Sequence, residues 1–584
     1  MPGLVGFVGR NLDLETGKTI LKDMRDLVTH DTTYVKDELF LKDDVCASRS
    51  HLNVVQKARQ PFHRNGVYIW LDGEFFDGRE AAQCEGGDPA VLYRLYQEAA
   101  DLSNLKRIDG IFSAVIFDSN KQLVHLATDR FGLRYLYWTV HEEGLLWTSE
   151  VKAVLAHPGF RPKIDERAVT QFHEVGYLLE DRTWLKGVEL LSSGTVLTWD
   201  IRDRSLRRAR YWWWDEIHAQ GANVDRSEVL EVAGRGFKDA VERRSGLGDG
   251  IGVTLSGGLD SRAILAAIPA RSEPVHAFTF GKSGCDDIRI AKRAAIAKGA
   301  VHHVVEIDAR NWFSDRLKGV WWTDGHLNLM HMHGIELLDR MKGIVKINLH
   351  GFLGDVIMGG SYLQDGQNFR DHHFLPLVAK HLGCRDDLVE NWEAYKSLAS
   401  PEAYLIQNRG RRFIAGGLQI LGTSIEQREP FFDSGMIELW LGLPGYLRLR
   451  SRLYNQMLVH NFPSYFKRIP WKDTGMPIGW PEGLAWVAGL GRKVQDRISG
   501  GVGGKAYSDY PEWLRQDPAR SFINELLFDS KAIYPDYIPK DGVEAEWACH
   551  LNGVDRAERI CRYLTFEIWL QQVFGGRFRP ELGN

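Results

Sequence analysis

Residues 255–262 read LSGGLDSR and follow the apolar run IGVT, which is typical of a buried strand. Two successive glycines let backbone N–H groups approach an anion without interference from a Cβ atom. A helix is expected to begin near Asp260, and its N-terminus adds positive potential at the same place. The residues expected to form this anion-binding loop are Leu255, Ser256, Gly257, Gly258, Asp260 and Ser261. The alternative is a structural turn in which the glycines only reverse the chain.

Asp260 indicates which kind of anion the loop binds. A carboxylate at this place repels a bare phosphate, so it favours a phosphate that is bridged by a cation such as Mg²⁺. The segment has neither the Gly-Lys-Ser/Thr ending of a P-loop nor the GxGxxG pattern of a dinucleotide-binding loop. The pattern instead fits a loop that binds pyrophosphate, which indicates cleavage of ATP between its α and β phosphates.

A second carboxylate is needed to hold the cation, and Asp355 is the candidate. It lies in INLHGFLGDVIMGG (347–360), where a strand pattern is followed by a turn. The carboxyl ends of parallel strands meet at one edge of a sheet, where ligands bind. We therefore expect Asp260 and Asp355 to hold Mg²⁺ together. For Asp355 taken alone, the alternative is a helix N-cap.

Two different patterns of elements surround these residues. Up to about residue 210, short strands are separated by turns, which is typical of layered β structure. One helix is predicted there over 88–100, with Asp88 as its N-cap. From 251 to 308 strands alternate with helices, which predicts a parallel sheet, and from about 361 onward the pattern is mainly helical. The predicted domains are 1–215 and 216–584.

The composition is that of a globular protein, and we expect it in the cytoplasm. The 584 residues are 44% hydrophobic and 26% charged, and the net charge of −4 argues against a dedicated nucleic-acid-binding protein. No apolar run is long enough to span a membrane, and the N-terminus does not resemble a signal peptide. The six cysteines form no Cys-x-x-Cys pair, so neither a zinc site nor a disulfide framework is expected.

The order of several motifs resembles that of the asparagine synthetase superfamily. The stretches that look like its glutaminase domain are GLVGFVG (3–9), LDGEFFD (71–77), IDGIFSAVIFD (108–118) and TDRFGLRYLYW (128–138). Those that look like its synthetase domain are LSGGLDSR, GFLGDVIMGG (351–360) and IEQREPFFD (425–433). The resemblance implies an α+β N-terminal sandwich like that of N-terminal-nucleophile (Ntn) hydrolases, followed by an α/β parallel-sheet ATP-pyrophosphatase domain with a helical C-terminal part. It also places Phe280 and Gly351 among the ATP-binding residues.

Two departures from the family pattern bear on function. Members that use glutamine carry a cysteine directly after the initiator methionine, whereas this chain has Pro2, which has no thiol. Cys46 and Cys84 are internal and cannot use an α-amine of their own as a base. The second loop reads HGFLGDVIMGGS where asparagine-making members read SGEGADELFGGY, so its acidic surroundings are replaced. We expect loss of glutamine hydrolysis and a changed carboxylate substrate, as in β-lactam synthetases and lasso-peptide cyclases.

The resemblance implies a ligation in two steps. A substrate carboxylate attacks the α-phosphate of ATP to give an acyl-adenylate and Mg-pyrophosphate, and an amine then displaces AMP. Lys472, in YFKRIPWKDTGMPIG (465–479), lies where the family carries a lysine that stabilises the developing charge, with Lys467 as the second choice. Glu426 aligns with a family glutamate that deprotonates the amine; alternatively, it is an ion-pair partner of Arg428 or Arg411.

Three functions are compatible with these residues. The first is a lasso-type macrolactam cyclase, which takes a precursor core peptide and works with a leader peptidase and a leader-binding protein. The segment 361–400 offers surface for such a ligand, although surface decoration is the alternative. The second is an ammonia- or amine-dependent amidotransferase acting on a small acid or a sugar acid. The third, a catalytically silent scaffold, is disfavoured because both aspartates and the complete loop are present.

Overall fold

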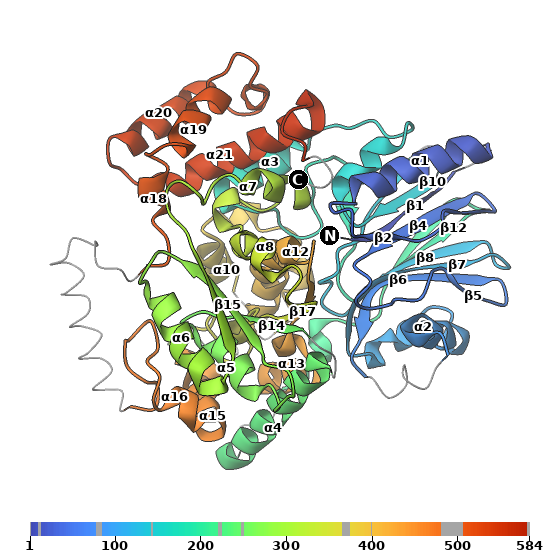
Figure 1. Ribbon diagram of the computed structural model, residues 1–584. Coiled ribbons are helices and arrows are strands. Elements are labelled where there is room, and N and C mark those ends of the chain that lie inside the picture. The colour runs from blue at the N-terminus through green and yellow to red at the C-terminus, as the bar shows by residue number, and fades with distance from the viewer. Residues whose placement is uncertain are drawn as a thin grey trace.

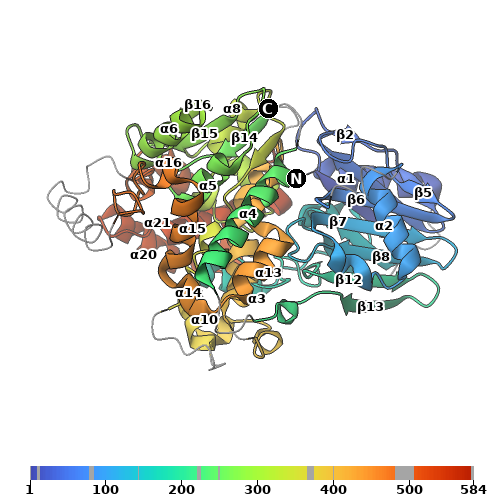
Figure 2. The same ribbon diagram turned by 90° about the horizontal axis from the view of Figure 1, so that it is seen from below.

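An antiparallel half and a parallel half lie side by side (Figure 1; Figure 2). The computed structural model describes residues 2–9, 13–77, 85–141, 144–219, 225–246, 250–364, 374–398, 400–480 and 506–580. Within them, no helix combines the length and the apolar character that crossing a membrane requires.

Two antiparallel sheets make up the N-terminal half. The seven-stranded sheet runs in the order β11-β9-β10-β1-β4-β2, with β3 paired to β4, and the six-stranded sheet runs in the order β13-β12-β8-β7-β6-β5. Helix α1 (Leu14–Leu27) covers the first sheet and α2 (Gly87–Glu98) covers the second (Figure 1). The layers are therefore helix, sheet, sheet, helix, which confirms the predicted sandwich.

The strands of this half are short and mostly buried. Those of the first sheet are β1 (Gly3–Val8), β2 (Val35–Lys36), β3 (Phe40–Lys42), β4 (Val45–His51), β9 (Tyr137–His141), β10 (Gly144–Thr148) and β11 (Glu189–Leu190). Those of the second are β5 (Phe62–Arg64), β6 (Val67–Phe75), β7 (Gly110–Asp118), β8 (Leu123–Thr128), β12 (Thr195–Asp200) and β13 (Ser205–Arg210). All nine residues of β7 are buried, because strands flank it on both sides and both of its faces are covered.

A five-stranded sheet organises the second half. Its order is β16-β15-β14-β17-β18, and every pairing is parallel, as the alternation of strands and helices predicts. The strands are β14 (Ile251–Thr254), β15 (His276–Gly281), β16 (Val301–Glu306), β17 (Ile347–Leu349) and β18 (Glu426–Arg428). Because parallel strands end at the same edge, the loops after β14, β15 and β17 lie together.

Helices cover both faces of this sheet. Figure 1 shows α4, α5 and α6 on one face and α8 and α12 on the other. The bounds of the helices used below are α3 (Glu166–Val175), α4 (Arg226–Ser245), α5 (Leu259–Ala267), α6 (Asp286–Lys298), α8 (Leu338–Met341), α9 (Gly354–Ile357), α11 (Glu402–Leu405), α12 (Gly416–Leu421), α20 (Lys540–Leu551) and α21 (Ala557–Leu570). The last of these, α21, packs against α3 and so joins the C-terminal region to the N-terminal half.

Buried ion pairs connect the two halves. Arg428 of β18 binds Glu74 of β6 through two N–H···O bonds of 2.6 and 2.7 Å. Arg244 of α4 likewise donates to Asp109 of the N-terminal half (2.9 Å). Each pair takes charges out of water, so the removal of one partner leaves the other uncompensated.

The predicted helix cap at Asp88 is wrong. Helix α2 begins at Gly87 after the N-cap residue Gly86, whose φ of 105° lies in the left-handed region that favours glycine. The Asp88 carboxylate instead accepts the N–H of Phe75 (3.0 Å) and thereby joins the helix to β6. A tertiary contact has taken the side chain that the local pattern assigned to capping.

Candidate active site

The glycine-rich loop lies at the C-terminal edge of β14, in the middle of the parallel sheet. Leu255 extends the strand by donating its N–H to the carbonyl of Phe278 (2.8 Å), and the chain then turns into α5. Inside the turn, the Gly258 N–H donates to Ser256 Oγ and the Ser256 N–H donates to Ser261 Oγ, both at 3.1 Å. No side chain of the described residues caps the first turn of α5. Its N–H groups are therefore available to an anion.

Asp260 and Asp355 converge beside this loop. The Asp355 N–H donates to Asp260 Oδ2 (2.9 Å), and the Tyr454 hydroxyl donates to Asp260 Oδ1 (2.8 Å). Asp260 is half-buried, and Asp355 is exposed. Burial raises the pKa of Asp260 to about 7, and the charge of Asp355 adds to the shift. Burial also raises the pKa of Asp355.

Two glycines of the second loop permit this approach. A Cβ on Gly351 would lie 2.9 Å from the Ser261 nitrogen, and one on Gly354 would lie 2.7 Å from Asp260 Cγ. Both separations are shorter than a van der Waals contact, so a larger residue fits at neither position without displacement. Leu353 has a φ of 54° and a ψ of 24°, a left-handed conformation that costs about 1–3 kcal/mol and is typical of functional loops.

The two carboxylates fit a magnesium ion. The two negative charges repel each other, and a divalent cation between them would offset this repulsion. In addition, Mg²⁺ prefers hard oxygen donors such as carboxylates as ligands. Across the described residues, no group of three or more His, Cys, Asp or Glu side chains is arranged to hold a metal. Two carboxylates leave the other coordination positions to water and phosphate oxygens, as is usual for Mg²⁺ in nucleotide sites.

Lys472 lies against the glycine-rich loop. Its Cβ is 3.2 Å from the place that a Cβ on Gly257 would occupy, and its Nζ is 3.5 Å from Asp287 Oδ1. The same Asp287 oxygen accepts the Gly257 N–H (2.8 Å). An ammonium group therefore stands at the edge of the anion-binding loop. The second choice, Lys467, lies beside Gly479 instead.

Phe280 lies near the end of β15, the strand next to the glycine-rich loop. Its ring centroid is 6.1 Å from that of His333 and 5.9 Å from that of Tyr507. The preceding residue, Thr279, donates its hydroxyl to the carbonyl of Leu255 (2.8 Å). An aromatic wall thus adjoins the loop, which suits the base of a nucleotide.

Glu426 does not join this cluster. It is the first residue of β18 and lies opposite Ile347, at the far end of β17 from the loop that carries Asp355. Its carboxylate forms an ion pair with Arg134 of the N-terminal half, rather than with either arginine considered from the sequence. The proton-acceptor role of Glu426 stays a prediction.

The described part of the N-terminal half contains no activated thiol. Cys46 is buried in β4 opposite Phe7, and burial raises the pKa of its thiol to about 12. A nucleophilic cysteine needs its thiolate near neutral pH. Pro2 is buried just before β1, and Cys84 lies outside the described residues.

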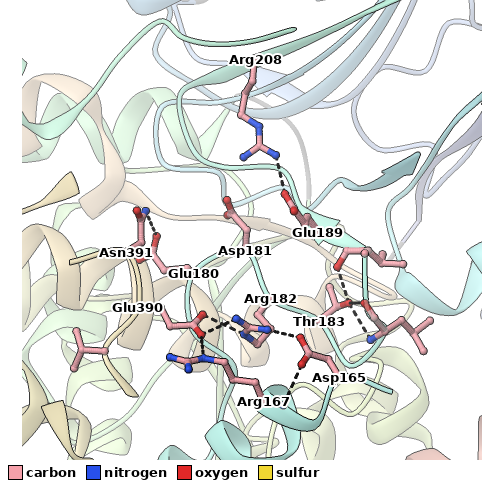
Figure 3. A pocket seen from close by; sticks show the side chains of 14 residues that line it. Asp165, Arg167, Glu180, Asp181, Arg182, Thr183, Glu189, Arg208, Glu390 and Asn391 are labelled. Atoms are coloured by element: carbon pink, nitrogen blue, oxygen red, sulfur yellow. Dashed lines mark hydrogen bonds and ion pairs between the residues drawn. The ribbon is translucent and has the colours of Figure 1, made fainter. Parts of the chain in front are cut away.

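A hollow of about 690 Å³ lies between the N-terminal half and residues 389–391. Figure 3 shows that its charged side chains pair with one another: Arg182 and Arg167 bind Glu390 at 2.7 and 2.5 Å. Arg208 binds Glu189 in the same way (2.7 Å). Since these charges are satisfied and the glycine-rich loop does not line the hollow, we do not assign ATP to it.

Two residues of the site were missed from the sequence. Tyr454, which donates to Asp260, stands 194 positions away in an ordinary helical pattern, and no signal in the sequence points to it. Asp287 was findable, because it is an acidic residue in the first turn of α6, directly after a predicted parallel strand.

Two family models match the chain in succession. Residues 1–212 match the glutamine amidotransferase domain, and residues 234–410 match asparagine synthase. This order agrees with the two halves of the fold.

Individual proteins are similar over part of their length. Amidase chyE of Penicillium rubens is 26% identical over 336 residues, which cover 50% of this chain and 49% of that protein. Asparagine synthetase (glutamine-hydrolyzing) 2 of Bacillus subtilis is 25% identical over 281 residues, which cover 44% of this chain and 37% of that protein. The chain thus spans half or less of the length of these relatives. A solved B. subtilis glutamine phosphoribosylpyrophosphate amidotransferase, complexed with ADP and GMP, matches 52% of this chain and 81% of its own at 12% identity and a TM-score of 0.26.

Proposed function

We propose that the chain is an ATP-dependent amide ligase of the asparagine synthetase superfamily, because it matches the glutamine amidotransferase and asparagine synthase domain models in succession. It adenylates a carboxylate with release of pyrophosphate, and it couples the acyl group to an amine with release of AMP. The observation that carries the proposal is the contact of the Asp355 N–H with the Asp260 carboxylate (2.9 Å), next to an uncapped helix N-terminus. This arrangement suits a magnesium-bound pyrophosphate.

In the first step a substrate carboxylate oxygen attacks the α-phosphorus, and the bond to the bridging oxygen of the β-phosphate breaks. The first N–H groups of α5 and the hydroxyls of Ser256 and Ser261 hold the phosphate oxygens. The Lys472 ammonium group offsets the charge that grows on the departing pyrophosphate. Mg²⁺, when held by Asp260 and Asp355, supplies further charge neutralisation.

In the second step an amine attacks the acyl-adenylate and AMP leaves. The attacking amine must lose a proton, and Glu426 is the predicted acceptor. In the structure its carboxylate forms an ion pair with Arg134 of the N-terminal half. Because that pair joins the two halves, the N-terminal half would then take part in the second step through Arg134.

For the substrate, we propose that carboxylate and amine belong to one peptide, so that the product is a macrolactam of the lasso type. Pro2 and the inert Cys46 favour an amine that arrives with a substrate rather than as ammonia from glutamine. Holding both groups in one folded peptide makes ring closure effectively unimolecular, which is worth up to about 7–11 kcal/mol of the barrier. The partners would then be a leader peptidase, which frees the amine, and a leader-binding protein.

The test is incubation of a candidate precursor peptide with the protein, ATP, Mg²⁺ and the matching peptidase. We expect AMP by chromatography and a peptide that has lost one water by mass spectrometry, with neither product from the Asp260→Asn variant. ADP as the product would refute the ligase. AMP with small acids and ammonia, and with no peptide, would establish the amidotransferase instead of the cyclase.

A further inference from the structure

Both oxygens of the Asp260 carboxylate accept hydrogen bonds from neutral donors. The Tyr454 hydroxyl donates to Oδ1 (2.8 Å), and the Asp355 N–H donates to Oδ2 (2.9 Å). The nearby Arg262 donates instead to two backbone carbonyls (2.8 and 3.1 Å), and it forms no ion pair with Asp260 among the described residues. These bonds fix the plane of the carboxylate, while its negative charge remains available to a cation.

The hydroxyl comes from an element outside the two loops of the site. Tyr454 lies on α15 (Arg452–Asn461), which packs against α4 and lies beside α5 (Figure 1; Figure 2). Asp260 is in the first turn of α5. A third part of the chain, far from both loops in sequence, thus reaches the carboxylate that is expected to bind the metal.

Packing fixes the ring of Tyr454. The residue is 1% exposed, and its ring stands edge-on to the rings of Phe431 and Trp440, with centroids 6.5 and 6.3 Å away and interplanar angles of 85°. Phe431 also packs against the Asp355 loop, because a Cβ on Gly354 would lie 2.7 Å from its Cζ. Since these contacts set the place of the ring, the hydroxyl is held in a single direction, toward Asp260.

Packing alone does not account for the hydroxyl. A phenylalanine at position 454 would occupy nearly the same volume and would bury no polar atom. A buried tyrosine hydroxyl usually finds a partner, so the simplest alternative is that Asp260 merely satisfies Tyr454. The two roles differ in what they control. A hydroxyl that is merely satisfied contributes to stability, whereas a hydroxyl that orients Asp260 also contributes to metal binding.

We propose that Tyr454 positions the Asp260 carboxylate for Mg²⁺ and favours this ion over larger cations such as Ca²⁺. The identity of the metal rests on the proposed function, whereas the contact between Tyr454 and Asp260 does not. Mg²⁺ requires nearly octahedral geometry with oxygen ligands at about 2.1 Å, whereas Ca²⁺ accepts irregular geometry and distances of about 2.3–2.6 Å. A carboxylate that cannot rotate suits the stricter ion. Residues that hydrogen-bond to a metal ligand typically contribute about tenfold to a hundredfold to metal affinity.

The test is calorimetric binding of α,β-methylene-ATP in the presence of Mg²⁺, of Ca²⁺ or of EDTA. Tyr454→Phe removes the hydroxyl and keeps the ring, so it should weaken binding in Mg²⁺ by about tenfold or more. Binding in Ca²⁺ should weaken by less than about threefold, because Ca²⁺ tolerates a rotated carboxylate. Binding in EDTA should be equally weak in both proteins. Circular dichroism checks the fold of each variant.

The matched control is Tyr465→Phe, which removes a tyrosine hydroxyl from the next helix, α16 (Pro463–Phe466). Tyr465 is also buried, and within the described part of the chain no hydrogen bond links it to either aspartate. This variant should bind α,β-methylene-ATP as the wild type does under all three conditions.

A double variant tests whether Tyr454 acts through Asp260. Asp260→Asn already removes the metal ligand, so the addition of Tyr454→Phe should change binding in Mg²⁺ by less than about twofold. If Tyr454→Phe alone folds poorly, the double variant should have the higher urea midpoint of the two. The reason is that an amide needs the lost donor less than a carboxylate does.

Three results would overturn the proposal. The first is wild-type binding of α,β-methylene-ATP that does not depend on Mg²⁺. The second is a Tyr454→Phe variant that binds in Mg²⁺ as the wild type does, or that weakens binding in Mg²⁺ and in Ca²⁺ equally. The third is an effect of Tyr454→Phe that persists undiminished when Asp260→Asn is present. Loss of the Mg²⁺ preference in Tyr454→Phe, in a protein that forms no AMP with any acid, would keep the positioning role and refute the proposed function.

Discussion

Replacement of Gly354 by alanine tests the idea that the Asp355 loop and the glycine-rich loop must touch. The new Cβ would lie 2.7 Å from Asp260 Cγ and 2.7 Å from Cζ of the fully buried Phe431. A normal separation is about 3.5 Å, so the Asp260 carboxyl must move by roughly 0.8 Å. Overpacking of this kind costs about 1–3 kcal/mol of stability, and a displacement near 1 Å costs on the order of a hundredfold in rate.

The matched control is Gly542→Ala, the same chemical change in another helix. Gly542 lies in the first turn of α20, and a Cβ there would meet no atom within 4 Å. This variant should be more stable by up to about 1 kcal/mol, because glycine disfavours a helix. Urea unfolding gives both stabilities, and calorimetry with Mg²⁺ and α,β-methylene-ATP gives the binding. If Gly354→Ala unfolds and binds as the wild type does, the close approach of the loops is not required.

Four further outcomes are expected. Asp260→Asn should weaken Mg²⁺-dependent nucleotide binding at least tenfold in calorimetry, and unchanged binding would contradict this. The same variant should not lower the urea midpoint, because burial raises the pKa of Asp260 and the charge of its carboxylate therefore opposes folding. Glu74→Gln leaves Arg428 without a full partner and should lower the free energy of unfolding by up to about 3 kcal/mol. Adding Arg428→Met should cause a smaller further loss. If the losses of the two single variants instead add up in the double variant, the pair is not coupled. Burial also raises the pKa of Glu180 to about 7, so the folded state holds its proton more tightly and stability falls as the pH rises from 4.5 to 7. Glu180→Gln should lack this part of the loss. Parallel profiles of stability against pH for the wild type and the variant would refute the prediction. Glutamine should yield no glutamate above background by mass spectrometry, since Pro2 has no thiol, and measurable turnover would disprove the loss of glutaminase.

Much of the fold follows from local patterns. The alternation of strands and helices after residue 250 predicts a parallel sheet, because the connections between parallel strands must cross over. The order β16-β15-β14-β17-β18 does not follow, since strand neighbours are chosen by packing far along the chain. Asp88 fails for the same reason: an aspartate near a helix start is a good cap, but Phe75 offers it a buried N–H.

The candidate site divides in a similar way. Asp260 and its loop were readable because glycines, serines and an aspartate are contiguous, and Asp355 because it follows a strand. Tyr454 was not readable, since it reaches the site through packing of elements that are distant in sequence. Glu426 shows the opposite case: the motif around it is clear, yet in the structure its carboxylate pairs with Arg134 at the domain interface.

The N-terminal half, which Pro2 predicts to lack a nucleophile, still has physical reasons to persist. Arg134 contacts the predicted proton acceptor Glu426. Glu74 compensates the buried charge of Arg428, two residues after Glu426 on β18. Removal of this half would leave Glu426 and Arg428 without these partners, so we infer that it is kept for the ion pairs that it supplies to the second half.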